Sequence, residues 1–298
     1  MLDPAQLAAL AAVHHRGAFD LAAADLAVTP SAISQRIRAL EERVGTLLIR
    51  RGQPCIATPA GQKLIRHFEA IRLMERQLSA DLPGLGDRAL PLRIAVNADS
   101  LATWLLPALA AVPGLLFDLV IADQDVAHEH LRQGEVSAAI TSDPGPLQGC
   151  DSTPLGALRY RATASPAFLA RHFSAGVSRD SLSRAPCLIF SEADRLQHLW
   201  ASQQGLLPPS GLRGHRLASA EGFVAACLLG MGWGMNPEGL IREALARGRL
   251  CELIPGSYTD IALYWQVTRL AAPALKPLSR EIRRAAATAL ITPSEADT

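Results

Sequence analysis

The sequence predicts an α/β protein in which a small helical N-terminal region precedes a larger region of alternating strands and helices. About sixty residues at the N-terminus carry helical spacing and helix caps, whereas strand-like and helix-like runs alternate after about residue 90. The chain has 298 residues, of which 49% are hydrophobic, so it is long enough for two or three compact units with separate cores.

The overall composition favours a protein of the reducing cytoplasm. The formal net charge of +1 neither supports nor excludes nucleic-acid binding, which therefore depends on where the charges lie. Residues 1–10 lack the basic start of a signal peptide, and no apolar stretch is long enough to span a bilayer, so we expect no membrane association. The cysteines form an odd set without CxxC spacing, which argues against disulfides and thiolate zinc sites: Cys55, Cys150, Cys187, Cys227 and Cys251.

Three short helices are predicted at the N-terminus. The first begins at Asp3-Pro4, a cap followed by a first-turn proline. The second follows Asp20 as its cap, with Leu21 and Leu26 turned inward. The third has Thr29 as its cap and a proline at its first position. Its buried stripe repeats at helical spacing through Ile33, Ile37, Leu40 and Val44.

A hairpin and a long helix follow. Two short extended runs flank Arg50-Arg51-Gly52-Gln53-Pro54, which predicts a wing over residues 47–57. Thr58-Pro59 then repeats the cap-and-proline start of a helix that should run to about Ala80. The helix carries a heptad seam suited to a partner helix: Leu64, Ile71 and Leu78, with Phe68 and Met74 between. A Pro- and Gly-rich linker at 82–86 ends it.

The second and third helices match a helix-turn-helix, whose second helix places polar residues in the major groove of double-stranded DNA. Residues 34–66 contain seven basic residues against two acidic ones, a local charge of +5, although each arginine alone could be an ordinary solvated charge. Hydroxyl, amide and guanidinium groups can read base edges or bind phosphates. The predicted DNA contacts are Thr29, Pro30, Ser31, Ser34, Gln35, Arg36, Arg38, Arg50 and Arg51.

The run from Ala22 to Glu41 resembles the signature of the LysR family of bacterial regulators, and the resemblance extends through Gly45–Arg51 and Thr58–Gly61. Ile49 stands where the family usually has Phe. The resemblance implies a winged helix-turn-helix at 1–58, a dimerising linker helix and hinge at 59–90, and a periplasmic-binding-protein-like effector domain at 91–298, with two subdomains. It also implies a homodimer through the linker helix, assembled as a homotetramer.

Strand-like and helix-like runs beyond the linker predict parallel α/β layers. The predicted strands at 157–164 and 261–267 are long enough to cross between two halves of this region. Subdomain I is then expected at about 91–160 and 267–298, and subdomain II at about 161–266. In open α/β sheets, ligands bind outside the carboxyl ends of the strands. The candidate effector contacts are accordingly Asn97, Asp99, Ser100, Asp123, Thr141, Ser142, Ser219 and Glu221.

These side chains combine groups for a carboxylate with groups for a cation. Hydroxyls and helix N-termini suit a carboxylate, whereas Asp99, Asp123 and Glu221 suit a positive charge, so a basic amino acid would use both. The alternative is that these acids only cap helices. Residues 97–104 and 263–266 resemble a branch of the LysR family that controls basic amino acid export. This resemblance implies lysine or arginine as effector and an exporter gene as target.

Other motifs do not support catalysis or a bound cofactor. Gly230-Met231-Gly232-Trp233-Gly234 lacks the third glycine of a nucleotide-binding loop and precedes a strand instead of following one. The imidazoles of His128-Glu129-His130 point apart on a helix, so no metal site is predicted. No GxSxG is present, and we expect no catalytic residue and no enzyme activity. Three alternatives remain open: an enzyme or transport-binding protein, a replication-origin or architectural DNA-binding protein, and a LysR-type regulator with a different effector.

Overall fold

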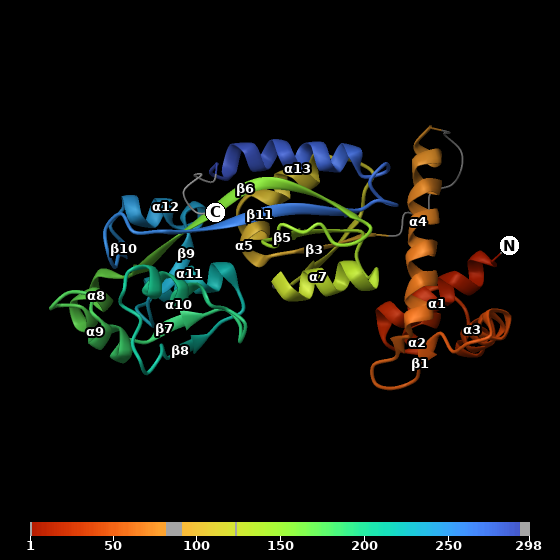
Figure 1. The fold of residues 1–298 in the computed structure, drawn as a ribbon, viewed down its shortest axis with the longest axis horizontal. Helices are drawn as coiled ribbons and strands as arrows, with labels where there is room; N and C mark the ends of the chain where they lie inside the picture. Colours follow the sequence, from red (N-terminus) through yellow and green to blue (C-terminus); the bar gives the residue numbers. More distant parts are fainter. Residues whose placement is uncertain (1, 82–90, 123, 293–298) are drawn as a thin grey trace.

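The computed structural model describes residues 2–81, 91–122 and 124–292. Figure 1 shows a small N-terminal domain, a long helix beside it, and an elongated α/β domain at the other end of the molecule. No helix among the described residues is long and apolar enough to cross a membrane.

The N-terminal domain contains three helices and a two-stranded hairpin, as the sequence predicts. Its elements are α1 (Pro4–Arg16), α2 (Phe19–Asp25), α3 (Pro30–Val44), β1 (Ile49–Arg50) and β2 (Ile56–Ala57). β1 and β2 pair antiparallel and form the wing. Leu7, Leu10, Ile33 and Leu40 form part of its core, which the three helices bury together.

The helix caps lie close to where the sequence places them. The Asp3 side chain accepts a hydrogen bond from the Ala5 N–H at 2.8 Å, and Thr29 caps α3 through the Ala32 N–H at 3.2 Å. The expected cap of α2 is wrong, because α2 begins at Phe19 and places Asp20 in its first turn.

Two apolar side chains predicted to face the core are exposed instead. Leu21 is 51% exposed, because Ala22 and Ala23 occupy the buried face of α2. Val44 is 39% exposed at the last position of α3, where Gly45 takes a left-handed conformation and ends the helix.

Helix α4 (Pro59–Asp81) begins at its predicted cap, where the Thr58 hydroxyl accepts a hydrogen bond from the Gly61 N–H at 3.2 Å. Phe68, predicted to belong to the seam for a partner helix, packs instead against the core of its own N-terminal domain with Ile65. Met74 is 55% exposed. The side chain of Leu78 lies outside the described residues.

The α/β domain is built on one sheet of seven strands in the order β10-β6-β11-β5-β3-β4, with β9 paired to β6. The predicted parallel layers are confirmed for one part of this sheet. β3 runs parallel to β4 and β5, but β11 is antiparallel to both β5 and β6, so the sheet is mixed. The strands are β3 (Leu92–Val96), β4 (Phe117–Ile121), β5 (Ala138–Thr141), β6 (Cys150–Ala164), β9 (Gly234–Pro237), β10 (Cys251–Glu252) and β11 (Thr259–Thr268).

The two predicted crossover strands are present and longer than expected. β6 has 15 residues and β11 has 10, and Figure 1 shows both running from one half of the domain to the other. The half nearer α4 carries α5 (Ala98–Ser100), a wide helical turn η1 (Leu101–Leu105), α6 (Leu106–Ala110), α7 (Gln124–Gln133) and α13 (Lys276–Ala289). The other half carries α8 (Pro166–His172), α9 (Arg179–Arg184), β7 (Cys187–Ile189), α10 (Leu196–Gln203), β8 (Gly214–Arg216), α11 (Ala220–Leu228) and α12 (Glu238–Ala246).

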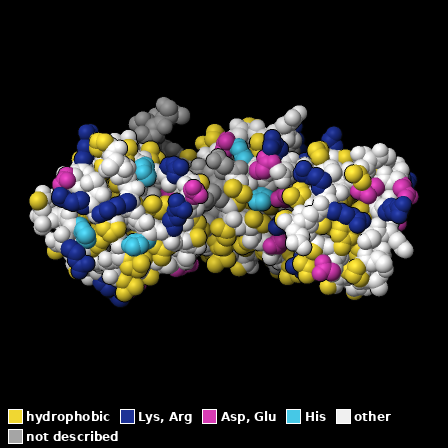
Figure 2. Space-filling view, turned by 90° about the horizontal axis from the view of Figure 1, so that it is seen from below, with side chains coloured by type: hydrophobic (Ala, Val, Ile, Leu, Met, Phe, Trp, Pro, Cys, Tyr) yellow, Lys and Arg dark blue, Asp and Glu magenta, His cyan; other side chains and the backbone are white. Residues whose placement is uncertain are grey.

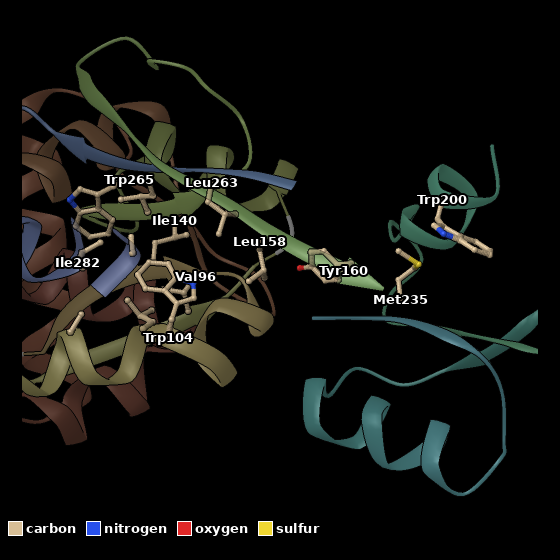
Figure 3. Close-up of a cluster of buried hydrophobic side chains, with 14 of the residues drawn as sticks. Val96, Trp104, Ile140, Leu158, Tyr160, Trp200, Met235, Leu263, Trp265 and Ile282 are labelled. Atoms are coloured by element: carbon tan, nitrogen blue, oxygen red, sulfur yellow. The ribbon is translucent and has the colours of Figure 1, made fainter. Parts of the chain in front are cut away.

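A wide π-helical turn at Leu101–Leu105 joins α5 to α6. Pro107 follows at the start of α6. A proline inside a helix lacks the N–H donor and pushes away the carbonyl four residues earlier, here that of Thr103, which widens the turn. Figure 3 shows Trp104 from this turn beside Val96 and Ile140, in the same buried cluster as Trp265.

Candidate nucleic-acid interface and ligand cavity

The N-terminal turn of α3 presents hydroxyl and amide groups on the surface of the N-terminal domain. Thr29, Ser31 and Gln35 are exposed, while Ser34 is half-buried. The Thr29 and Ser31 hydroxyl oxygens lie 2.9 Å apart. Since Ile33 on the same helix is buried, the polar side chains face away from the core, as the reading face of a recognition helix must.

The basic residues of the predicted interface differ in how firmly they are held. The Arg51 guanidinium lies 5.0 Å above the Phe19 ring, a cation–π contact that orients it, and Arg50 is exposed in β1. Arg38 pairs with Glu42 at 3.2 Å on the open surface, which offsets its charge. Figure 2 shows basic and acidic side chains interspersed across the molecule when it is seen from below.

The wing is fixed to α3 through one carboxylate. Glu41 Oε1 accepts hydrogen bonds from the backbone N–H groups of Leu48 at 2.8 Å and Ile49 at 3.3 Å. This contact sets the position of β1 relative to α3.

Two further residues belong to the predicted set of DNA contacts. Pro30 is exposed and Arg36 is half-buried.

A cavity of about 400 Å³ lies in the α/β domain, lined by both of its halves. Its lining includes Asn97, Asp99 and Ser142 after strands β3 and β5, which are predicted effector contacts. It also includes Tyr160 of β6, which lies between the two halves in Figure 3, and residues at the start of α10 and α11. This volume is within the range of small-molecule sites.

Asp99 is a carboxylate of the cavity lining that a neighbouring hydroxyl orients. The buried Tyr160 hydroxyl donates a hydrogen bond to Asp99 Oδ2 at 2.6 Å. Burial, with a smaller contribution from the Asp99 charge, raises the pKa of Tyr160 well above its ordinary value, so the hydroxyl remains a donor. The hydrogen bond therefore fixes the orientation of the Asp99 carboxylate.

A second acid in the cavity, Asp194, has a structural role at the start of α10. Its carboxylate accepts hydrogen bonds from the N–H groups of Phe190 at 2.8 Å and Leu196 at 2.9 Å, and from Gln197 Nε2 at 3.1 Å. The adjacent Arg195 is exposed and also lines the cavity. A guanidinium at this position is the group in the cavity suited to a carboxylate.

Three side-chain amides line the cavity and have an oxygen without a donor. Asn97 Oδ1, Gln197 Oε1 and Asn236 Oδ1 are buried and have no hydrogen-bond partner among the described residues. A buried acceptor without a donor costs about 1–3 kcal/mol. These oxygens are covered by other protein atoms, so the carboxylate of Asp99 is the better candidate for a ligand contact in the cavity.

Several predicted effector contacts lie outside the cavity lining. The Ser100 hydroxyl is buried and accepts a hydrogen bond from Trp104 Nε1 at 3.1 Å, and Thr141 Oγ1 accepts one from the Asp143 N–H. Ser219 caps α11 through the Gly222 N–H at 3.1 Å, and Glu221 is exposed on that helix. Asp123 lies outside the described residues.

Sequence reasoning missed the cavity residues that come from β6, β9, α10 and the two residues before α10: Tyr160, Asp194, Arg195, Gln197 and Asn236. Their positions depend on strand pairing and on packing between distant segments, which no local sequence pattern marks. Within the part of the chain that the structure describes, no three His, Cys, Asp or Glu side chains come together as a metal site.

Comparisons with known proteins agree with this architecture. The family described as "Bacterial regulatory helix-turn-helix protein, lysR family" matches residues 4–62, and "LysR substrate binding domain" matches residues 86–287. The HTH-type transcriptional regulator ArgP of Pseudomonas fluorescens is 43% identical over 296 residues, which cover 98% of this chain and 99% of that protein.

Two solved structures are similar over nearly the whole chain. ArgP from Mycobacterium tuberculosis matches with a TM-score of 0.82 and 38% identity, covering 98% of this chain and 100% of that one. Full-length LysG from Corynebacterium glutamicum with bound effector Arg matches with a TM-score of 0.71 and 33% identity, covering 97% and 99%. The chain belongs to the LysR family of DNA-binding transcriptional regulators, with a helix-turn-helix domain and an effector-binding α/β domain.

Proposed function

We propose that this regulator binds L-lysine or L-arginine in the cavity of the α/β domain and controls transcription of a gene for a basic amino acid exporter. The observation that carries the proposal is the Asp99 carboxylate, which lines the cavity and is oriented by the Tyr160 hydroxyl. A side-chain ammonium or guanidinium supplies several N–H donors and a charge opposite to that of Asp99.

The effector's two ends would bind opposite sides of the cavity. Asp99 would bind the side-chain cation, while Arg195 and the Ser142 hydroxyl would bind the carboxylate, since these groups line the same cavity. The LysG structure with bound effector Arg supports a basic ligand, because that protein shares the fold over nearly its whole length. The cavity has no catalytic role in this proposal.

The DNA-bound form would be a homodimer joined through α4, assembled as a homotetramer in the cytoplasm. Two recognition helices in a dimer bind half-sites about 34–36 Å apart or at a multiple of this spacing. The exposed Met74 on α4 is available for a partner helix. Genome-wide occupancy tests the target: one or two promoters next to an exporter gene support it, whereas dispersed or origin-centred occupancy supports an architectural or replication role.

Thermal shift with the twenty amino acids and two neutral analogues tests the effector. L-citrulline matches arginine in shape but lacks its charge, and L-norleucine replaces the lysine ammonium with a methyl group. A ligand that binds only the native state stabilises it by about 2.7 kcal/mol at a hundred times its dissociation constant. We expect lysine or arginine to raise the melting temperature and the analogues to leave it unchanged. Equal shifts with arginine and citrulline would contradict a charge-selective cavity.

A further inference from the structure

The end of α7 contacts the N-terminal domain through a backbone turn that holds Glu135 in place. Gly134 takes a left-handed conformation with φ of 73° after the helix. The Glu135 N–H donates to the His130 carbonyl at 2.9 Å, and the Gly134 N–H donates to the Leu131 carbonyl at 3.1 Å. These bonds form a helix-terminating motif that fixes the Glu135 backbone to α7.

Glu135 joins two histidines from different domains. Its Oε1 lies 3.2 Å from His14 Nε2 on α1, and its Oε2 contacts Nδ1 of His130 on α7. The Ala57 N–H in the wing donates to His14 Nδ1 at 3.3 Å, so His14 Nε2 carries the proton donated to Glu135. A hydrogen-bonded relay thus runs from β2 of the wing through His14 and Glu135 to α7.

The relay is enclosed, and a second contact supports it. The His14 and Glu135 side chains are only 7% and 17% exposed. Arg66 of α4 donates from Nη1 to the Arg132 carbonyl at 2.6 Å. The Arg66 stem covers Gly134 so closely that a Cβ there would lie 1.8 Å from Arg66 Cγ. The C-terminal end of α7 therefore contacts α4 and, through Glu135, also contacts His14, which accepts the hydrogen bond from the wing.

The same helix also connects to the ligand cavity. Ala122, shortly before α7, and Ser142, directly after β5, both line the cavity. Ala127 and Leu131 of α7 are buried against the sheet in one core cluster. The ten residues of α7 span ~15 Å, so the helix reaches from the cavity side to the relay as one packed unit.

We propose that Glu135 is a positioning residue that fixes the wing to α7, so that ligand-driven movement of α7 reaches the DNA-binding surface. His14, which accepts the hydrogen bond from the wing, is held in place by the charged Glu135 carboxylate. The hydrogen bond from His14, and after it the one from His130, outweigh burial and lower the pKa of Glu135 to about 2, so it is ionised at neutral pH. The coupling to a ligand rests on the proposed function, whereas the positioning of the wing does not.

Hydrogen exchange on the ligand-free full chain tests the relay. Glu135→Ala removes both histidine contacts, and Glu129→Ala is the matched control, because within the described part of the chain Glu129 pairs only with Arg132 and Gln133 of α7. We expect exchange at residues 10–17 and 52–57 to be roughly tenfold faster in Glu135→Ala than in the wild type. In the control, exchange at these residues should equal that of the wild type. Exchange in Glu135→Ala equal to that of the wild type overturns the proposal.

A glycine pair provides an independent variant. Gly134→Ala places a methyl group against Arg66, whereas Gly149→Ala introduces the same left-handed strain where nothing lies within 4 Å. Faster exchange at residues 10–17 should follow only the change at Gly134. Equal effects of the two substitutions would mean that backbone strain, and not the contact between the domains, controls exchange there.

Hydrogen exchange with added L-arginine separates this proposal from the proposed function. Saturating L-arginine should change exchange at residues 97–104 and 10–17 of the wild type, but only at 97–104 of Glu135→Ala. A change confined to 97–104 in the wild type refutes the coupling and keeps the effector. If L-arginine changes neither segment, the proposed effector is wrong, and the ligand-free comparison decides the relay by itself.

Discussion

Removal of one charge at Asp99 tests the cavity most directly. Asp99→Asn keeps the side-chain shape, and its amide oxygen can still accept the hydrogen bond that Tyr160 donates to Asp99 at 2.6 Å. The substitution removes the negative charge that would face the effector's cation. Hydrogen bonds to charged groups contribute about 1.5–3 kcal/mol. At about 1.4 kcal/mol per tenfold change, the affinity for lysine or arginine should fall roughly 10- to 150-fold.

Isothermal titration calorimetry at fixed ionic strength measures this affinity. Glu221→Gln is the matched control, because it removes one negative charge from an exposed position of α11 outside the cavity lining. Its affinity should stay close to that of the wild type. Unchanged affinity in Asp99→Asn would refute Asp99 as the cation contact, and an equal loss in both variants would indicate a long-range charge effect. An unchanged melting temperature without ligand shows that the fold is intact.

Further predictions concern DNA binding and stability. Gln35→Ala should relax base preference in selections from random duplexes; an unchanged preference would contradict a base contact. Arg51→Ala should weaken binding to all duplexes alike and reduce the salt slope by about 0.9, measured by anisotropy in a salt series. Thr29→Ala removes the acceptor for the Ala32 N–H and should lower the free energy of unfolding by about 1 kcal/mol in urea, whereas Thr29→Ser should not. Burial foremost lowers the pKa of His15 from 6.5 to about 4, so the unfolded chain binds this proton first as pH falls. As pH falls from 6.5 to about 4, His15 should therefore lower the free energy of unfolding by at most about 1.4 kcal/mol per pH unit. His15→Gln should flatten this pH dependence.

Local signals predicted most of the N-terminal domain, because its helices begin and end at residues that act within one turn. Thr29 caps α3 through a backbone group three residues away, so its role needs no distant partner. The inward or outward direction of Leu21 depends instead on which face of α2 packs against α1 and α3. Two alanines allow close packing there, and the larger leucine remains outside.

The cavity was only half predictable, because the rule about strand ends applies to parallel strands of one sheet. It located Asn97 and Asp99 after β3 and Ser142 after β5, which are parallel neighbours of that kind. Tyr160 lies instead in the middle of the antiparallel crossover β6, paired with Thr259 on one side and Pro237 on the other. Its approach to Asp99, 61 residues earlier, depends on this register. Since a shift by one residue would turn Tyr160 to the opposite face of the sheet, the pairing of the crossover strand decides which carboxylate the cavity holds in place.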